Sequence, residues 1–193
     1  MVELNAMGVA CPGPVIMAKK TIDSGEGYFS ITVDNDIAVK NLTKLAESQG
    51  FSVETKEIEG GFQVIFTGEG VVPVKETTAK QPNNWALFVN KDAIGTNEGD
   101  LGPSLITMYF YTLSECNDPP RYILFMNEGV RLPSENEQIA EHLKSLQEKG
   151  TEVLVCGTCL KYYHLEDKLM AGDISNMYDI NERMLKADKV ITL

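Results

Sequence analysis

The stretch GVACPGPVIMAKK, residues 8–20, places a thiol directly before two prolines at the start of a predicted helix. The first turn of a helix has free N–H groups, so a proline there loses no hydrogen bond and holds a suitable φ. If Pro12 is the first helical residue, Pro14 is the third and Cys11 is the N-cap. The positive end of the helix then favours the thiolate of Cys11, and the small Gly13 leaves its approach open.

Two interpretations of Cys11 follow from these residues. Cysteine is often buried, so Cys11 is either a small apolar residue that fills a strand–helix junction or a reactive thiol. Its place at the predicted positive end of a helix favours the reactive thiol, because the thiolate is the nucleophilic form of cysteine.

The segments around this stretch predict a small domain over residues 1–69 with the order β-α-β-α-β-β. Two helices that cover one face of a four-stranded sheet form the simplest packing for this order. Asp34 or Asn35 is expected to cap the second helix. The predicted strands are 2–6, 28–34, 51–58 and 62–68, and the predicted helices are 14–23 and 35–50. The residues of the second helix that are expected to face the core are Ile37, Leu42 and Leu45.

A polar stretch with two prolines, residues 70–83, predicts a linker, and residues 84–193 predict a second domain. Its predicted strands are apolar throughout, which is typical of a parallel sheet with helices on both faces. Ligands of such sheets bind where loops leave the carboxyl ends of the strands. The predicted strands are 85–90, 121–127, 151–157 and 189–193, the predicted helices are 105–116 and 137–150, and the strand-end loops are 91–104, 128–136 and the one beginning at Cys156.

The composition of the chain limits the functions and the cellular compartment that we expect for it. The 193 residues carry a formal net charge of −11, which disfavours binding to nucleic acid. The N-terminus lacks a secretory signal and no stretch is long enough to cross a bilayer, so we expect a cytoplasmic protein with no membrane partner. In that compartment, four cysteines indicate thiol chemistry or metal binding more than a disulfide framework.

The pair Cys156 and Cys159 lies where the third apolar strand of the second domain ends. It is interpreted as a dithiol redox centre, as a nucleophile with a second thiol to resolve or relay, or as two small packing residues. Half of a zinc site is disfavoured because a second cysteine pair is missing. We therefore expect no metal and no cofactor.

Four other features carry weaker predictions. The glycines at 95, 99 and 102 fit no phosphate-binding spacing, so their loop is expected to border the second cysteine site. His164 is expected to be an exposed helix residue rather than a proton shuttle, and Cys116 a packed core residue. Arg131 is expected either to pair with a thiolate or to lie on the surface.

The residues LNAMGVACPGPVIMAKKTI, together with the β-α-β-α-β-β order, resemble the TusA/SirA family of small sulfur carriers over residues 2–68. In that family the cysteine of the Cys-Pro-x-Pro motif takes up a sulfane sulfur as a persulfide and passes it to a partner. The resemblance therefore implies that Cys11 is the carrier thiol, with Pro12, Gly13 and Pro14 as the rest of its motif.

Residues 85–193 resemble the DsrE/TusD-type family, a flavodoxin-like parallel sheet whose members relay sulfur through a cysteine at a strand end. Cys156 occupies the matching place and is preferred over Cys159. Members of this family commonly assemble, so the resemblance implies a homo-oligomer through the second domain.

The two domains together, with the segments CGTCL and SNMYDI, resemble the YedF proteins, which are linked to selenium metabolism. The resemblance implies a sulfurtransferase-like carrier of sulfur or selenium. Its partners would be a cysteine desulfurase or another donor, and a downstream acceptor protein. Two alternatives stay open: a thiol–disulfide oxidoreductase that uses Cys156 and Cys159, and a regulatory protein that binds a partner without catalysis.

Overall fold

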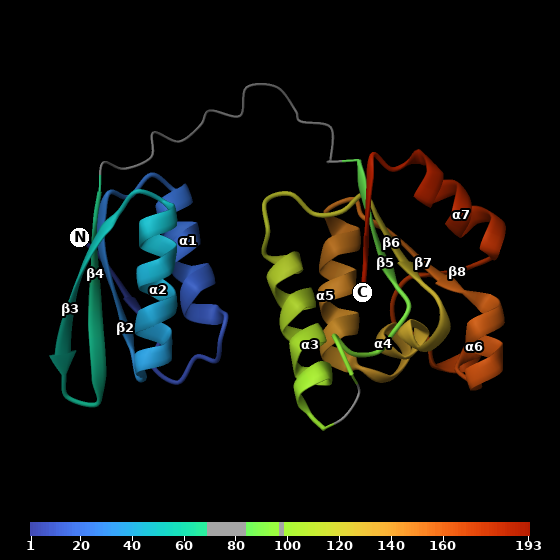
Figure 1. Cartoon of the computed structure of the whole chain (residues 1–193), viewed down its shortest axis with the longest axis horizontal. Coiled ribbons are helices and arrows are strands. Elements are labelled where there is room, and N and C mark those ends of the chain that lie inside the picture. The colour runs from blue at the N-terminus through green and yellow to red at the C-terminus, as the bar shows by residue number, and fades with distance from the viewer. Residues whose placement is uncertain (69–83, 97–98) are drawn as a thin grey trace. The chain divides into compact units, whose positions relative to one another are not determined.

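The computed structural model describes residues 1–68, 84–96 and 99–193, which form two compact units, the first before residue 69 and the second after residue 83 in the sequence (Figure 1). The predicted linker, residues 70–83, and the last residue of the predicted first domain lie outside the described residues. Within the described part of the chain, none of the helices combines the length and the apolarity that crossing a membrane requires.

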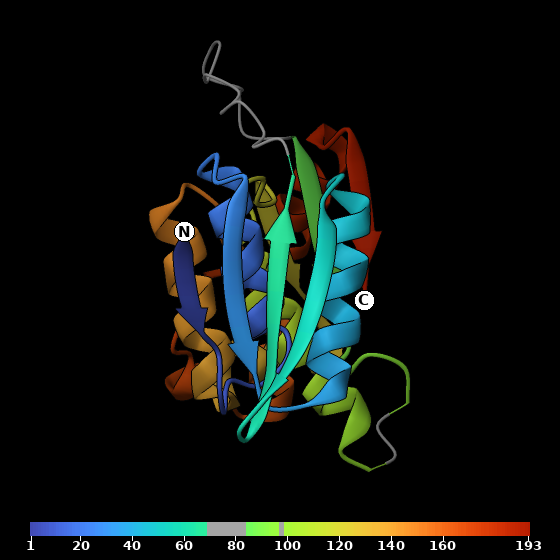
Figure 2. The same ribbon diagram turned by 90° about the vertical axis from the view of Figure 1, so that its left-hand side faces the viewer.

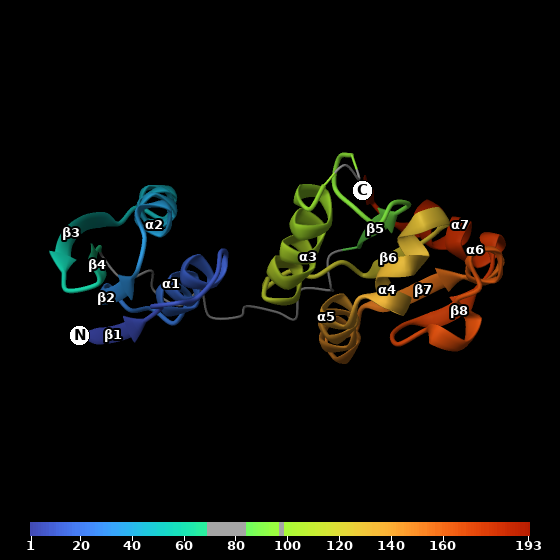
Figure 3. The ribbon, with the colours of Figure 1, turned by 90° about the horizontal axis from the view of Figure 1, so that it is seen from below.

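The first unit is a four-stranded sheet with two helices on one face, as the sequence predicts. The strands lie in the order β1-β2-β4-β3, with β1 parallel to β2 and the other pairs antiparallel. Figure 2 shows the face of this sheet that the helices leave open, and Figure 3 shows both helices on the opposite side. The elements are β1 (Val2–Asn5), α1 (Gly13–Asp23), β2 (Tyr28–Val33), α2 (Asp36–Ser48), β3 (Ser52–Ile58) and β4 (Gly61–Thr67).

The core of the first unit lies between the sheet and the two helices. The stacked rings of Phe29 and Phe66 have centroids 4.5 Å apart, and Phe51 meets both of them edge-on. Leu42 of α2 is fully buried against this cluster and Leu45 packs at its border. The prediction that Ile37 faces the core is wrong, because 63% of its side chain is exposed in the first turn of α2.

The start of each helix in the first unit tests the predicted caps. Asn35 caps α2, since its side-chain oxygen accepts a hydrogen bond of 2.8 Å from the N–H of Ala38. The predicted start of α1 is wrong by one residue. Pro12, with φ −93° and ψ 15°, is the N-cap, and the helix begins at Gly13. Cys11 therefore precedes the N-cap, and the Cys11–Pro12 peptide bond is cis.

The second unit is a five-stranded parallel sheet in the order β8-β7-β6-β5-β9, with helices on both faces, which confirms the predicted class of fold. One face packs against α3 and α5, and the other packs against α7 (Figure 1). Its elements are β5 (Trp85–Val89), α3 (Leu101–Ser114), β6 (Tyr122–Phe125), η1 (Asn127–Arg131), α4 (Leu132–Glu135), α5 (Glu137–Glu148), β7 (Glu152–Cys156), α6 (Gly157–Tyr163), η2 (Glu166–Lys168), β8 (Asp173–Ser175), α7 (Met177–Lys186) and β9 (Lys189–Thr192).

Two differences from the predicted second unit have local causes. The helix α3 begins at Leu101, four residues earlier than predicted, and Pro103 lies in its first turn, where a proline costs no hydrogen bond. The short elements α6 and β8 and the amphipathic helix α7 were not predicted. The first two are shorter than the windows in which hydrophobic periodicity can be detected.

Candidate functional site

The loop between β1 and α1 that carries Cys11 is tied to the neighbouring strand β2. The N–H of Ala6 donates to the carbonyl of Thr32, and the N–H of Gly8 donates to Oδ2 of Asp34 at 2.8 Å. This bond from Gly8 lowers the pKa of the Asp34 carboxyl from its usual value, with a further contribution from the amide of Asn35. Gly8 has a φ of +73°, in the left-handed region that glycine adopts without strain.

Gly13 has a packing role that differs from the predicted one. It is buried, and a Cβ atom there would lie only 2.4 Å from Cγ1 of Val9. The missing side chain therefore lets the loop close over the first turn of α1. The carbonyl of Pro12 accepts the first hydrogen bond of the helix, from the N–H of Ile16 at 3.1 Å.

The Cys11 thiol is exposed at a pocket between the N-terminal turns of α1 and α2. The side-chain amide of Asn41, on α2, approaches its Sγ atom, with Nδ2 at 3.9 Å. None of the residues that line this pocket is charged, so the thiol is surrounded by apolar groups and amides. The lining residues are Val9, Cys11, Pro14, Val15, Asn35, Ile37, Ala38 and Asn41.

The second cysteine pair lies where β7 passes into α6. Cys156 is the last residue of β7 and the N-cap of α6, and only 3% of it is exposed. Cys159 follows in the first turn of α6 and is half-buried, so it is more exposed than the preferred Cys156. The site therefore has one enclosed thiol and one accessible thiol.

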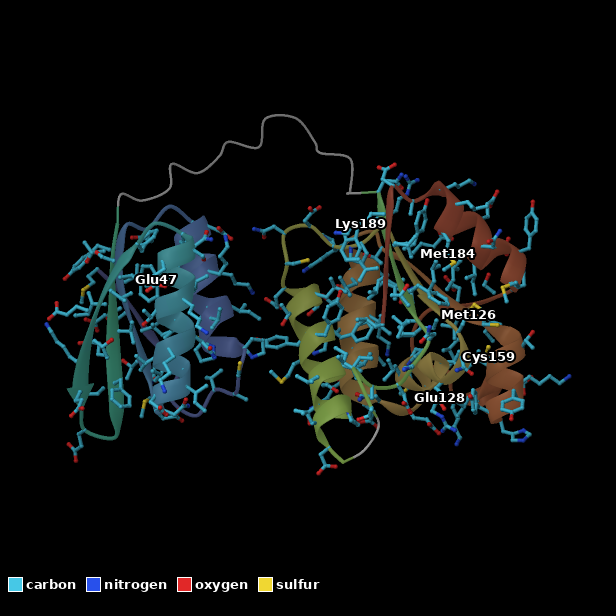
Figure 4. The ribbon with its side chains drawn as sticks, viewed as in Figure 1. Glu47, Met126, Glu128, Cys159, Met184 and Lys189 are labelled. Atoms are coloured by element: carbon cyan, nitrogen blue, oxygen red, sulfur yellow. The ribbon has the colours of Figure 1, made fainter. Side chains whose placement is uncertain are left out.

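The segment that follows β6 supplies a hydrogen bond to the accessible thiol. The N–H of Asn127 points to Sγ of Cys159 at a distance of 3.2 Å. Figure 4 shows Cys159 on α6 facing the segment that carries Met126 and Glu128. An N–H aimed at sulfur stabilises negative charge on it, so this contact taken alone favours the thiolate of Cys159.

A short network holds Asn127 in place. Its φ of +49° is left-handed, and its side-chain oxygen accepts a hydrogen bond of 3.2 Å from the hydroxyl of Tyr163. The guanidinium of Arg131 lies over the Tyr163 ring, 4.6 Å from its centroid, and pairs with Glu135 at 3.1 Å. Arg131 thus braces Tyr163 and pairs with a carboxylate. Asn127 and Tyr163 were missed from sequence, although Asn127 lies at a strand end where parallel sheets place ligand-binding residues.

Burial raises the pKa of the Cys159 thiol above its usual value of 9.0, and the N–H of Asn127 only partly offsets this. We therefore expect alkylation of Cys159 to accelerate as the pH rises toward 9 and to stay below half of its maximal rate there, because less than half of the group is thiolate. In urea, which removes the burial, the half-maximal rate should move to lower pH. Peptide-resolved alkylation by mass spectrometry measures both profiles, and identical profiles would contradict the expectation.

The remaining weaker candidates are the glycine-containing loop, His164 and Cys116. Asn90, Lys91 and Gly95 line a hollow with the last residues of the chain at the ends of β5 and β9, and β6 separates β5 from the strand of Cys156. His164 is exposed where α6 ends, and Cys116 is half-buried against the core. Among the described residues, no group of three or more His, Cys, Asp or Glu side chains could hold a metal ion.

Comparison with known proteins assigns each unit to a family. Residues 2–68 match the family Sulfurtransferase TusA, and residues 86–193, more than half of the chain, match the DsrE/DsrF-like family. No curated protein matches the chain significantly.

Three solved structures resemble parts of the chain. A SirA-like protein from Desulfitobacterium hafniense is 40% identical, covers 34% of this chain and 95% of its own length, and has a TM-score of 0.33. The ychN protein from E. coli is 21% identical over 57% of this chain and 99% of its own, with a TM-score of 0.40. A conserved protein of unknown function from Bacteroides thetaiotaomicron is 13% identical over 60% of this chain and 100% of its own, with a TM-score of 0.44.

Both matched families belong to sulfur-carrier and sulfurtransferase systems, which gives the chain a role in sulfur relay. The Cys-Pro-x-Pro loop lies inside the first match, and the pair of Cys156 and Cys159 lies inside the second. The chain belongs to the DsrE/DsrF-like family and carries a TusA/SirA-like domain in front of its DsrE-like domain.

Proposed function

We propose that this chain is a chalcogen carrier of the YedF type, which takes up sulfur or selenium on Cys11 and delivers it to an acceptor protein. The observation that carries the proposal is the exposed Cys11 thiol at the mouth of an uncharged pocket between two helix N-termini. The resemblance to the YedF proteins is the argument for selenium, and thiolate chemistry serves both elements. A cysteine desulfurase is the proposed donor.

Loading of Cys11 is a simple exchange between two sulfur atoms. The Cys11 thiolate attacks the outer sulfur of a persulfide on the donor, and the inner sulfur of the donor leaves as its thiolate. The product is a persulfide on Cys11, with no net oxidation or reduction. The apolar pocket suits this cargo, because a sulfane sulfur brings no hydrogen-bonding groups that need polar partners.

The second domain is the proposed acceptor of the chalcogen that Cys11 carries. It would receive the chalcogen from Cys11 of the same chain or of a second copy in a homo-oligomer. Cys156 is almost wholly enclosed, so we place the receiving thiol at Cys159 and assign Cys156 a supporting role. The hydrogen bond from Asn127 supports this choice, because it stabilises an anionic sulfur at Cys159 alone of the two.

Replacing Cys11 by serine should abolish loading of the first domain. The full chain is incubated with a cysteine desulfurase and cysteine, and mass spectrometry locates the added sulfur on each cysteine-containing peptide. We expect one sulfur on Cys11 of the wild-type chain and none on that peptide in Cys11→Ser. Cys116→Ser is the matched control, since Cys116 packs against the core of the second domain. Uptake by Cys11→Ser equal to that of wild type would refute the carrier role.

A thiol–disulfide oxidoreductase is the second candidate function. It is favoured by the position of Cys156 and Cys159 at the start of one helix, the arrangement that redox-active pairs use. A redox titration, combined with the loading experiment, distinguishes the two functions. The oxidoreductase requires a reversible disulfide at a physiological potential in a chain that transfers no chalcogen. The exposed thiol of Cys11 does not favour the remaining alternative, a purely regulatory protein.

A further inference from the structure

We propose that Cys156 is a resolving thiol that releases the cargo of Cys159 as hydrogen sulfide or hydrogen selenide. In this step the enclosed thiol attacks the loaded thiol, and the two cysteines end as a disulfide. The inference rests on the proposed function in one respect, because Cys159 must first carry a chalcogen. It adds an outcome that a simple relay lacks: the cargo leaves in reduced form without a second protein to accept it.

The start of α6 brings the two sulfur atoms to the same side of the helix. Cys156 is the N-cap and Cys159 is the third helical residue, the two positions whose side chains meet in a capping box. Residues three apart on a helix have Cβ atoms about 5–6 Å apart, and a disulfide needs about 3.5–4.5 Å. A small movement at the helix end therefore suffices to join them. Both side chains also pack against the same apolar cluster.

The surroundings of the two thiols give them different roles. Cys156 is enclosed by apolar side chains, so a donor protein cannot reach it and a persulfide there would have to displace its neighbours. Cys159 is only half-buried and accepts a hydrogen bond from the N–H of Asn127. The outward thiol is thus suited to loading, and the inward thiol is suited to an attack that needs no approach from solvent. Cys156 belongs to a buried apolar cluster whose other members are Ala86, Tyr122, Leu124, Leu154 and Ile180.

The step balances without an external oxidant. The sulfur of Cys156 attacks the inner sulfur of the Cys159 persulfide, and the bond between the inner and outer sulfur atoms breaks. The outer sulfur leaves with the electron pair of that bond and takes up the thiol proton of Cys156, so the products are hydrogen sulfide and the disulfide. The sulfane sulfur is reduced to sulfide while two thiols are oxidised. With selenium as the outer atom, the same step releases hydrogen selenide.

Turnover then depends on two classes of reaction. A thiol reductant must reduce the Cys156–Cys159 disulfide before Cys159 can be loaded again, and thiol–disulfide exchange with a dithiol supplies that step. The released hydrogen chalcogenide must be consumed by a reaction in which sulfide or selenide is the nucleophile. Attack on the outer sulfur instead would move the persulfide to the enclosed thiol and release nothing.

The test uses the full chain with Cys11→Ser, so that chalcogen can be counted at the second site alone. The reduced protein is treated with glutathione persulfide, freed of the reagent and analysed for sulfide and for the state of each cysteine. We expect one sulfide for each Cys156–Cys159 disulfide. With Cys156→Ala added, the extra sulfur should stay on Cys159. Its release should fall roughly a hundredfold at about 10 µM protein, because a neighbouring thiol acts at an effective concentration in the millimolar range.

Controls separate the possible failures. Cys116→Ser in the same background should behave as the parent, and Cys156→Ser provides a second variant whose fold is compared by circular dichroism. A parent chain that keeps a stable persulfide on Cys159 and releases no sulfide would overturn the resolving role and leave the carrier role intact. Equal release from the parent and from Cys156→Ala would also overturn it. Absence of sulfur on Cys11 in the desulfurase experiment would instead refute the carrier role itself.

Discussion

Replacing Phe29 by alanine is expected to destabilise the TusA-like domain strongly. Phe29 is fully buried, stacks on Phe66 at a centroid distance of 4.5 Å and meets the edge of Phe51. Truncating a buried phenylalanine to alanine costs about 3–5 kcal/mol of folding free energy. A unit of 68 described residues has a total stability of only about 3–10 kcal/mol at the usual value per residue. The substitution therefore removes a large part of the stability.

Hydrogen exchange of the full chain, read by mass spectrometry on peptides, measures this effect without separating the domains. Peptides from residues 1–68 should lose protection in Phe29→Ala, and peptides from residues 86–193 should keep it. Ile37→Ala is the matched control, because Ile37 is 63% exposed and its truncation removes little packing. Unchanged protection of residues 1–68 in Phe29→Ala would show that the aromatic cluster is not the centre of this core.

Replacing Gly129 by alanine is expected to disturb the second cysteine site from a distance. Gly129 is buried in η1, and an added Cβ would lie 2.3 Å from the carbonyl oxygen of Val89. That oxygen belongs to the backbone of β5 and accepts a hydrogen bond from the N–H of Met126. It therefore cannot move away from the added Cβ without breaking this bond. The strain, about 1–3 kcal/mol, must be relieved by a shift of η1, which carries the N–H of Asn127 away from Cys159.

Two readouts show whether this shift occurs. Urea unfolding should show the loss of stability, and the pH profile of Cys159 alkylation should move further upward, because the N–H of Asn127 partly offsets the effect of burial on the pKa of this thiol. Gly150→Ala is the control. It also strains the chain, because Gly150 has a φ of +95°, but an added Cβ there has open space. It should cost about 1–2 kcal/mol and leave Cys159 unchanged. Equal pH profiles of Cys159 alkylation in Gly129→Ala and Gly150→Ala would show that the position of η1 does not affect Cys159.

The carrier thiol of the first domain could be proposed from sequence because its surroundings are local. Two prolines and a glycine within four residues restrict where a helix can start, and they predicted a helix immediately after Cys11. The position of the first helical residue depends on more than these local rules. The loop packs through Val9 on Gly13 and is tied through Gly8 to Asp34, and α1 begins at Gly13, one residue after the start at Pro12 that these rules allow.

In the second site, the burial of each thiol and its hydrogen-bond partner depend on contacts that the sequence does not reveal. The spacing of Cys156 and Cys159 at the end of a predicted strand indicates that the two thiols are close together, but it does not tell which one faces the core. Cys156 is enclosed because its strand lies between β6 and β8 in the sheet, with α7 packed over that face. The N–H that meets Cys159 comes from Asn127, which is 32 residues away in the chain.

The sequence by itself determined the order of the main elements, the two-domain composition, the position of Cys11 before its helix and that of Cys156 at the end of its strand. These follow from interactions over a few residues: hydrophobic periodicity, the conformations open to proline and glycine, and helix capping. Only the tertiary structure decided that Ile37 is exposed, that Cys159 is the accessible thiol of its pair, and that Asn127 and Tyr163 belong to the site. Those features depend on which strand ends lie side by side and which faces are covered, and such contacts join residues far apart in the chain.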